Sequence, residues 1–562
     1  MKTKKRISKL VATSVIAVAA IAPSFGQSNN GVACGCPPVA SRPTVLLTSL
    51  PGYTAISGTY GGELLNGAVL TCDKTYIIDK KIYIPSGQTI TINPGTVLKG
   101  RVNAVPAEAT ALVIERGGKI MADGSSDCQI IFTAEADPVD GSFAISNKGL
   151  WGGVVVLGKA TNNLTLALNG PFVAGGSGKL AVADGLGTIE GFATSNTQDQ
   201  YGVNLSLGET FNDNDNSGIL KYVSIRHSGA ILAVGAEING LTLGSVGRGT
   251  SIEHVEIVSC ADDNIELFGG TVNLRYISTL FGNDDMYDYD LGWSGKAQFL
   301  FGMKTDNTAS IDSDNGFEAD SDDNKASNNS PKSHPIIYNV TLMGNSKATT
   351  TSDNSSIAAI NAKELTEGEI YNSVFAYFKN GFNMVKSLGT RTLGTSEAYH
   401  NWANVGGNSL NTLKVKCNTF VGCTNPLTIG SSAGNVVATD NTQFTTTDLN
   451  VIVAGNTLPG FSYNFTVDNS TNVFAVKNDV VPNPSLSTVG CPVAPADGFF
   501  RAANYRGAFA STGENWLTDW SYAQVLGVTS GLVACPTDMN GDGITDVSDF
   551  LIFAPAFGTS CN

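Results

Sequence analysis

The sequence predicts an all-β fold of the right-handed parallel β-helix type, a solenoid built from stacked coils. Three observations support this prediction. Gly (63 residues), Asn, Ser and Thr are abundant, whereas charged residues make up only 15% of the chain; this composition favours strands joined by turns. Short β-branched runs recur, and the runs that begin at residues 253, 275 and 297 are equally spaced in the sequence. No long segment shows the 3.6-residue periodicity of an amphipathic helix.

The first recurring runs predict short strands. In each run apolar residues alternate with others, and Gly, Asn, Pro or Asp bound the run, which is the pattern of a strand between two turns. These runs are 81–84, 89–92, 111–114, 129–132 and 153–157.

A second series fits one five-residue template at 221–225, 253–257, 275–279 and 297–301, and it continues at 338–342 and 371–375. The shorter step, from 253 to 275, is the length of one coil, and the longer steps are a coil with an extruded loop. Stacked coils lie about 4.8 Å apart and share one core. This alignment places Val255, Ile277 and Phe299 in one inward column. A β-propeller, with about 40 residues in each blade, fits these steps poorly.

The N-terminus has the pattern of a secretory signal peptide over residues 1–26. Basic residues precede an apolar run from Leu10 to about Ala22, and small residues precede a cleavage point after Gly26. The apolar run is too short for a membrane anchor. We therefore expect a secreted or cell-surface protein without a membrane span in the mature chain.

The rest of the chain is expected to divide into four segments. Residues 27–75 are predicted to be an N-terminal segment and cap, and 76–440 the parallel β-helix. Residues 441–530 are predicted to contain the last coils and a second cap, in which the aromatic region from Phe499 to Trp520 covers the other end. Residues 531–562 are predicted to form a calcium-binding segment.

The charge of the chain restricts its partners. Residues 1–26 carry five positive charges and no negative ones, so their removal takes the formal net charge from −15 to −20. Such a surface repels nucleic acid and favours cations. Extracellular glycans or a surface protein are the expected partners.

Ten cysteines in an exported chain are expected to form disulfides rather than to bind metal. Two local pairs are predicted: Cys417 with Cys423, and Cys535 with Cys561, which would enclose the C-terminal loop. The remaining connectivity stays open.

Several motifs resemble those of a known group. They are TITINPGTVLKG (89–100), GGKIMADG (117–124), LWGGV (150–154), ADDNIELFGGTVN (261–273), NYRGAF (504–509) and NWL (515–517). They are similar to the large secreted β-helix proteins of Bacteroidetes and related environmental bacteria. The resemblance covers roughly residues 70–525 and implies the same fold, but it implies little about activity because fold does not fix function.

Three acidic stretches follow one another in the middle of the chain. Asp263 and Asp285 are one coil step apart, so stacking should place them on the same edge, and Asp314 follows after a coil and a few inserted residues. Carboxylates about 5 Å apart repel by about 0.8 kcal/mol per pair in water and by about 3 kcal/mol at an effective dielectric of 20. The residues expected at this edge are Asp262, Asp263, Glu266, Asp284, Asp285, Asp288, Asp312, Asp314 and Glu318.

Three interpretations of these carboxylates stay open. They are turn residues that bond their own backbone, ligands of a second metal site that holds calcium, or a glycan site in which Asp263, Asp285 and Asp314 are the catalytic candidates. The third interpretation rests on a resemblance to pectin-cleaving β-helix enzymes, although the His-Gly and Arg-Ile-Lys motifs of the pectin hydrolases are absent. The aromatic residues Tyr287, Tyr289 and Trp293 would either stack on sugar rings or pack as one row.

The C-terminal sequence DMNGDGITDVSD (538–549) predicts a calcium loop. Oxygen-bearing side chains stand at positions 1, 3, 5, 9 and 12, with Gly543 at position 6, where such a loop turns sharply. The expected ligands are Asp538, Asn540, Asp542, the Ile544 carbonyl, Asp546 and Asp549. The loop resembles those of dockerin modules, which bind cohesins through two loops; this chain has one, so a calcium-stiffened clasp is the expectation.

These features predict a secreted or cell-surface β-solenoid that serves as an adhesion, matrix or envelope structural protein, stabilised by calcium and able to bind glycans. Two alternatives remain open. One is a polysaccharide lyase or glycoside hydrolase of the pectin-cleaving β-helix type, and the other is a module docked into a multiprotein assembly through its C-terminus.

Overall fold

The computed structural model describes residues 34–165, 180–189, 192, 196–233, 236–304, 315–321, 329–344, 358–384, 398–402, 411–430, 433–454, 467–468, 473–474, 488–510, 515–526 and 528. The predicted signal peptide, the calcium loop 538–549, the Cys535–Cys561 pair, Asp312 and Asp314 lie outside these residues. Within the described part of the chain, no helix combines the length and apolar character needed to cross a membrane.

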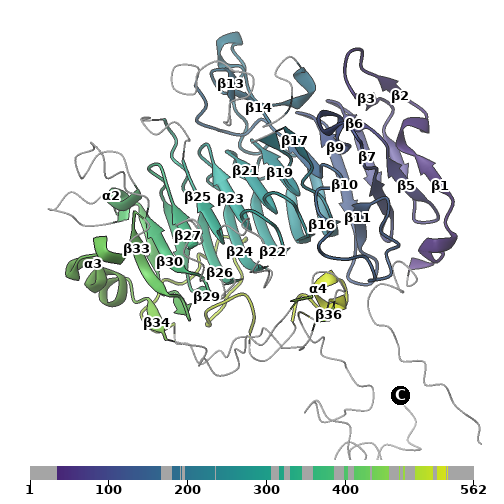
Figure 1. Ribbon diagram of the computed structural model, residues 1–562. Coiled ribbons are helices and arrows are strands. Elements are labelled where there is room, and N and C mark those ends of the chain that lie inside the picture. The colour runs from purple at the N-terminus through teal and green to yellow at the C-terminus, as the bar shows by residue number, and fades with distance from the viewer. Residues whose placement is uncertain are drawn as a thin grey trace, which may run out of the picture.

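Two long, mainly parallel sheets wrap around one core, which confirms the predicted parallel β-helix (Figure 1). One sheet follows chain order: β2 (Tyr53–Ala55), β3 (Gly61–Leu64), β6 (Lys81–Ile84), β9 (Ala111–Ile114), β12 (Val154–Leu157), β19 (Leu241–Gly244), β21 (Ile265–Phe268), β23 (Tyr287–Asp290), β25 (Phe317–Ala319), β27 (Ala358–Ala362), β30 (Asn380–Met384) and β33 (Asn425–Ile429). We call this sheet the second sheet, and we call the larger sheet described next the first sheet. Only its first pairing, β2 with β3, is antiparallel.

The first sheet forms the other sides of the solenoid. It contains β1 (Thr44–Leu46), β4 (Ala68–Leu70), β5 (Thr75–Ile78), β7 (Thr89–Ile92), β8 (Val97–Gly100), β10 (Lys119–Asp123), β11 (Ile130–Ala134), β16 (Gly218–Arg226), β20 (Ser251–Val258), β22 (Asn273–Leu280), β24 (Lys296–Met303), β26 (Ile336–Met343), β28 (Gly368–Tyr371), β29 (Val374–Ala376), β31 (Leu413–Lys416), β32 (Thr419–Val421) and β34 (Val451–Val453). Short antiparallel groups lie outside the two sheets: β13 (Leu180–Ala183), β14 (Leu186–Thr188) and β15 (Gln200–Gly202), then β17 (Ile231–Ala233) with β18 (Ala236–Glu237), and β35 (Val467–Asp468) with β36 (Val473–Phe474).

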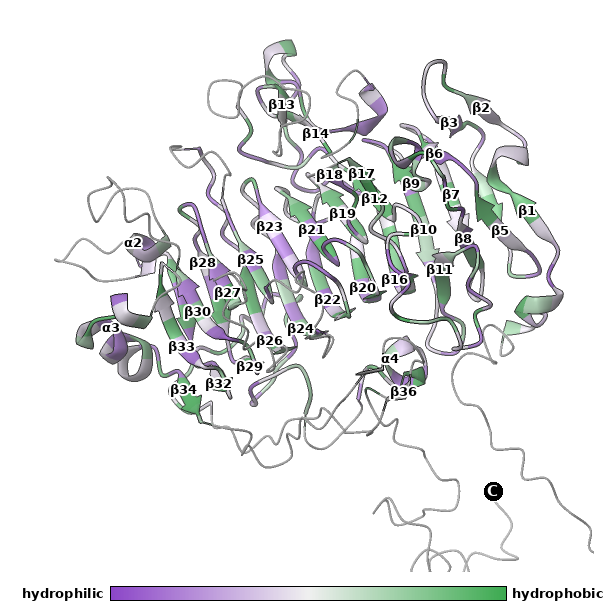
Figure 2. Ribbon diagram, in the orientation of Figure 1, coloured by the Kyte–Doolittle hydropathy of each residue, from purple (hydrophilic) through white to green (hydrophobic). Residues whose placement is uncertain are grey.

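The coil repeat follows from the alternation of apolar residues along the strands. Val255 of β20 pairs with Ile277 of β22, one coil later, and both side chains are fully buried in the shared core. The apolar stripes of successive strands are visible in Figure 2. No coil buries these residues alone, so stacking supplies the hydrophobic stabilisation.

The long strands of the first sheet bend at a corner, where one residue of each takes the left-handed conformation. This conformation is unusual for residues other than glycine, and here it recurs coil after coil, with φ between 49° and 58°, at Tyr222, His254, Tyr276, Phe299 and Asn339. The first four of these residues carry rings, and the rings stack in one column with centroid distances of 4.4, 4.5 and 5.0 Å between successive rings. We call this set the corner column.

One predicted register, which placed Phe299 in the inward column, is wrong. Ile277 pairs with Leu300 rather than with Phe299, so this coil is longer by a single residue than the coil before it. Phe299 instead stacks on Tyr276 at the corner, outside the inward column that was predicted for it. Because successive side chains of a strand point to opposite faces, a shift of one residue moves every side chain to the other face.

Both predicted caps also need correction. β1, β3 and β4 already pair in parallel with later strands, so the solenoid begins within the segment that was predicted to be a cap. Two disulfides, Cys34–Cys128 and Cys36–Cys72, fasten this end. At the other end, Phe444, in the π-helical turn η8 (Gln443–Thr447) that directly follows α3 (Ala438–Thr442), packs on Phe420.

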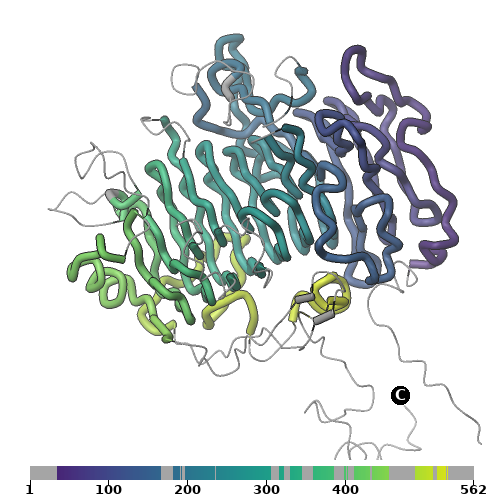
Figure 3. The backbone as a smooth tube through the Cα atoms, in the orientation of Figure 1, coloured from purple at the N-terminus to yellow at the C-terminus, as the bar shows by residue number. Residues whose placement is uncertain are grey.

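The segment around Phe499 to Trp520 does not cover an end of the solenoid. It belongs to a strap, residues 488–510, 515–526 and 528, that runs back along the side of the coils and includes α4 (Tyr522–Val525) (Figure 3). The strap is held by hydrogen bonds to three different coils: Ala508 N–H to Thr341 Oγ1 (2.9 Å), Arg275 to the Phe499 carbonyl (2.7 Å) and Tyr522 N–H to Glu256 Oε1 (2.7 Å).

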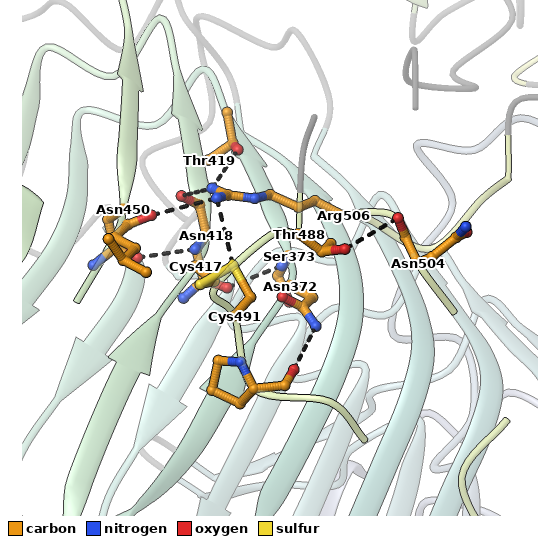
Figure 4. The surroundings of a disulfide bond; sticks show 12 residues. Asn372, Ser373, Cys417, Asn418, Thr419, Asn450, Thr488, Cys491, Asn504 and Arg506 are labelled. Carbon is orange, nitrogen blue, oxygen red and sulfur yellow. Dashed lines mark hydrogen bonds between the residues drawn. A yellow bond between two sulfur atoms is a disulfide. The ribbon is translucent and has the colours of Figure 1, made fainter. Parts of the chain in front are cut away.

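A disulfide closes the start of the strap, and it corrects the predicted Cys417–Cys423 pair. Cys417 is bonded to Cys491 of the strap (Figure 4). Cys423 is a free thiol. Beside this bond, Arg506 donates to the Asn418 carbonyl over 2.8 Å. Sequence proximity favoured the local pair, but the return of the strap brings a distant cysteine to the same coil.

Candidate functional site

The acidic residues gather where the chain turns from the first sheet to the second. Each turn lies between a long strand and a short one, between β20 and β21 and between β22 and β23. The first turn carries Asp262 and Asp263, and the second carries Asp284 and Asp285. The coil repeat therefore places two pairs of carboxylates at one edge of the solenoid.

A ladder of hydrogen bonds links these turns. The Asp285 N–H donates to Asp263 Oδ1 over 2.8 Å, and the Asn315 N–H donates to Asp285 Oδ1 in the same way. Asn315 Oδ1 continues the ladder by accepting from the Ala358 N–H over 3.0 Å. These contacts are turn chemistry of the kind that the sequence suggested, except that each side chain bonds the backbone of the next coil rather than its own.

Carboxyl oxygens at this edge lie close enough together to hold a cation. Asp262, Asp263 and Asp284 form one group of ligand atoms that all lie within 4.8 Å of one another. Asp263, Glu266 and Asp288 form a second such group, and all three of its side chains are buried. Asp263 belongs to both groups, so the two groups form one continuous cluster, which we call the acidic edge.

The acidic edge continues along the outer face of the second sheet. Glu266 pairs with Asp288, and Asp288 pairs with Glu318, so these three carboxylates occupy one row across β21, β23 and β25. At the end of the row the Lys363 amine forms an ion pair with Glu318 and lies 3.9 Å from Asp320. Burial opposes the charged form of this amine, but the two carboxylates outweigh burial and raise its pKa.

Burial and like charges act together on Asp263. The side chain is only 8% exposed. Burial, followed by the charges of Asp262, Asp284, Asp285 and Asp288, raises the pKa of its carboxyl well above the ordinary value. The site therefore favours a proton or a cation at Asp263.

Two polar side chains from neighbouring coils support the edge. Asn239 donates its amide to Glu266 Oε2, and the fully buried Lys304 donates to the backbone carbonyl of Asp284. No pattern in the sequence pointed to Asn239, Lys304 or Lys363. Asn315 stands next to the predicted Asp314, and the ladder position that we expected for that carboxylate belongs to the amide.

The predicted sugar-stacking residues face the wrong way for that role. Tyr287, Tyr289 and Trp293 are at most 2% exposed and belong to the central core. The Tyr287 hydroxyl donates to the Phe301 carbonyl over 2.9 Å, and the Trp293 indole donates to the Val272 carbonyl over 3.1 Å. The three rings pack as core residues, and no ring face is left for a sugar.

Comparison with known proteins adds one finding. The family described as a pectate-lyase-like beta helix domain matches residues 62–458. No curated protein and no solved structure matches the chain.

Proposed function

This chain belongs to the family of pectate-lyase-like β-helix domains, and from that premise we propose that it is an exported, calcium-stabilised β-solenoid that binds glycans as an adhesion, matrix or envelope protein. The three disulfides support an extracytoplasmic location, because such bonds persist in oxidising compartments. The basic and apolar pattern of residues 1–26 supports export.

The acidic edge carries the proposal. Its five carboxyl groups come from two coils, and three of them, Asp263, Glu266 and Asp288, form one buried group. Like charges at this spacing cost about 3 kcal/mol per pair at an effective dielectric of 20. Calcium offsets this cost directly, since it takes six to eight hard oxygen ligands and is plentiful outside cells. The candidate ligands are Asp262, Asp263, Glu266, Asp284 and Asp288, and the charge of Asp285 acts on Asp263 beside them.

A second calcium is proposed at residues 538–549. The spacing of the oxygen-bearing side chains and the turn glycine Gly543 support it. The two sites would serve different parts of the chain, one stiffening the middle coils and the other the C-terminus. Their effects are separable by substitution at each.

Calcium is expected to raise the melting temperature of the mature protein. Calcium at 100 times its Kd stabilises a folded protein by about 2.7 kcal/mol. Asp284→Asn removes one ligand charge from the group of Asp262, Asp263 and Asp284, and it keeps the Asp284 backbone carbonyl that accepts from Lys304. This variant should lose most of the calcium shift in the main transition and, in chelator, should melt no lower than the wild type. Differential scanning calorimetry with calcium and with chelator measures both effects.

The matched control is Asp123→Asn at the exposed end of β10, which should keep the full calcium shift. Asp542→Asn should change calcium stoichiometry without abolishing the shift of the middle coils. Because the folded-state pKa of Asp263 is raised, its protonation stabilises the fold below the unfolded pKa, and this stability is lost as pH rises. In chelator the melting temperature should therefore be higher at pH 5 than at pH 7. If calcium does not change the melting temperature of the wild type, the proposal of a calcium site at the acidic edge is wrong.

A second candidate function is hydrolysis of a glycan at the same edge. Asp263 favours it, because burial and the neighbouring carboxylates raise the pKa of its carboxyl group, as the role of a general acid requires. The neighbouring carboxylates Glu266 and Asp288 are close enough to Asp263 for one of them to act as the nucleophile. A lyase is less well supported, since it needs a neutral base, and the outer-face Lys363 is held in its charged form.

Hydrolysis predicts a specific result. Neutral and acidic polysaccharides incubated with the wild type should yield new reducing ends, and Asp263→Asn should reduce their rate of formation at least a hundredfold while leaving the fold intact by circular dichroism. Asp123→Asn should retain the wild-type rate. Reducing ends that form equally with Asp263→Asn would exclude this mechanism. A wild type that yields no products on any substrate leaves the structural role as the function.

A further inference from the structure

A cleft of about 840 Å³ lies near the start of the solenoid, away from the acidic edge. It opens over the outer face of β6, which three strands of the second sheet separate from β21. The turn between β2 and β3, the short helix η4 (Pro106–Glu108) and the helix η5 (Thr197–Asp199) surround it. Its lining includes Tyr60, Lys81, Tyr83, Phe192, Asn196 and Asp199, and we call it the Lys81 cleft.

Alternation along β6 explains why charged and polar groups reach the cleft. Ile82 and Ile84 point into the core, so Lys81 and Tyr83 point outward. Gly61 of β3 pairs with Lys81 and adds no side chain above it. The outward residues are nevertheless buried, because the loops around the cleft fold over them.

Three polar side chains are locked together on one wall. The Tyr83 hydroxyl donates to Asp199 Oδ1 over 3.0 Å, and the Asn196 amide donates to Asp199 Oδ2 over 2.7 Å. Asn196 also donates to the Tyr83 oxygen over 3.1 Å. Burial raises the pKa of Asp199 to about 6, so the carboxyl group is mostly ionised at neutral pH and accepts these bonds. The wall is thus fixed before any ligand arrives.

Lys81 stands on the same strand with a different environment. Its amine lies 4.1 Å from the centroid of the Phe192 ring, and only 9% of the residue is exposed. Burial lowers the pKa of the amine, and Asp199 partly opposes this effect. Within the described residues the amine has no hydrogen-bond acceptor and no ion pair. Because Lys81 lines the cleft, a ligand oxygen there can accept a hydrogen bond from its amine.

The chemistry of the cleft selects a class of ligand. The negative charge of Asp199 would repel an anion, and the positive charge of Lys81 would repel a cation. A hydroxyl group accepts from an ammonium and donates to a carboxylate, so a ring with neighbouring hydroxyls suits both groups at once. The apolar sides of such a ring would contact Ile56 and Ala107, which also line the cleft.

We propose that the Lys81 cleft binds a neutral sugar unit of a glycan, with Lys81 donating to one hydroxyl and the wall of Asp199 and Tyr83 accepting from its neighbour. The proposal rests on the proposed function for the class of ligand that the protein meets. It deepens that function by giving the glycan a place of its own, separate from the calcium site. No bond is made or broken in this step.

The test is isothermal titration calorimetry of the mature full-length chain with three neutral probes: cellohexaose, xylohexaose and mannohexaose. At least one should bind, and Lys81→Met should weaken it at least tenfold, since Met keeps the apolar stem on Phe192 and loses the amine. Ser57→Trp should do the same by filling the cleft from an exposed position of its lining, without touching a buried group. Lys119→Met, on the exposed face of β10, is the matched control and should bind like the wild type.

Three outcomes would overturn the cleft as a neutral-sugar site. They are no binding of any neutral probe, equal binding by Lys81→Met and Ser57→Trp, or binding of trigalacturonate in preference to the neutral probes. Calcium-dependent melting, measured on the same samples, keeps this failure distinct from failure of the proposed function. If calcium raises the melting temperature but no sugar binds, only the proposal for the cleft is wrong. If a sugar binds through the cleft but calcium does not change the melting temperature, only the proposal for the calcium site is wrong.

Discussion

Replacing Arg226 by Met is expected to lower the free energy of unfolding by about 3–5 kcal/mol, because it leaves a buried carboxylate without its cation. Arg226 and Glu256 are 1% and 0% exposed, and their charged groups lie 3.8 Å apart. Ser224 bridges them, accepting from Arg226 over 2.7 Å and donating to Glu256 over 2.6 Å. The strap completes the site, since the Tyr522 ring lies 4.1 Å from the guanidinium and its N–H donates to Glu256.

Guanidinium unfolding measures this loss, and a second substitution identifies its cause. Arg226→Met with Glu256→Gln removes both charges and should recover most of the lost stability, because an amide can still accept from Ser224 and Tyr522. Arg248→Met is the control: Arg248 is half exposed and lies 3.6 Å from Asp213, and such surface pairs contribute up to about 1 kcal/mol. Equal losses in Arg226→Met and in the double variant would show that packing, and not the buried charge, holds this site.

Burial raises the pKa of Glu256, so its proton uptake adds a pH dependence with a definite sign. A carboxyl group whose folded pKa is raised stabilises the fold below the unfolded pKa, and this contribution is lost as pH rises. In Arg226→Met the attraction of the guanidinium is gone. The deficit of this variant should therefore be smaller at pH 5 than at pH 8.

The fold was predictable from the sequence because the repeat is local. The shortest recurring step between apolar runs reports the length of a coil, and Val255 opposite Ile277 is its consequence. The register at Phe299 was not predictable in the same way. An aromatic residue fits an inward position and a stacked corner equally well, so the hydrophobic pattern did not separate the two.

The candidate site was partly predictable for the same reason. The same step brings Asp263 and Asp285 together wherever the coil is regular, and the hydrogen bond between these residues follows. The inward direction of Tyr287 and Tyr289 was not resolved, because alternate tyrosines are compatible with either face of a strand. The Lys81 cleft was missed altogether: Lys81 and Asp199 are far apart in the sequence, and only the loops that fold over β6 bring them together.

The path of the strap had no local signal, and it explains why the cysteine pairing was wrong. Cys417 occupies the corner position in its coil, with a left-handed φ of 58° like the residues of the corner column. Residues at this corner face the strap: Asn339 donates to the Tyr505 carbonyl over 2.8 Å, and Asn372 donates to the Pro492 carbonyl over 3.1 Å. Cys417 continues the same set of contacts as a covalent bond.

Replacing Cys417 and Cys491 together by Ser is expected to destabilise the protein by up to about 4 kcal/mol. The bond joins residues 74 apart, and closing a loop of this length restricts the unfolded chain by about that amount in the chain-entropy description. The loss of stability should be concentrated in the strap, because the core shared by the stacked coils does not depend on the strap. Trp516 and Trp520 lie in the strap against the corner column, so tryptophan fluorescence should report an early transition in the variant.

The free thiol Cys423 provides the control for this second prediction, because it lies close to Cys417 in the sequence and forms no disulfide within the described part of the chain. Cys423→Ser should leave the fluorescence transition in place, since it removes no covalent link. Reduction of the wild type should reproduce the early transition only if the Cys417–Cys491 bond holds the strap, and Cys34–Cys128 and Cys36–Cys72 would then add a separate change near the N-terminal coils. An unchanged fluorescence transition in the Cys417→Ser, Cys491→Ser variant would mean that hydrogen bonds such as those of Arg506 hold the strap without the disulfide.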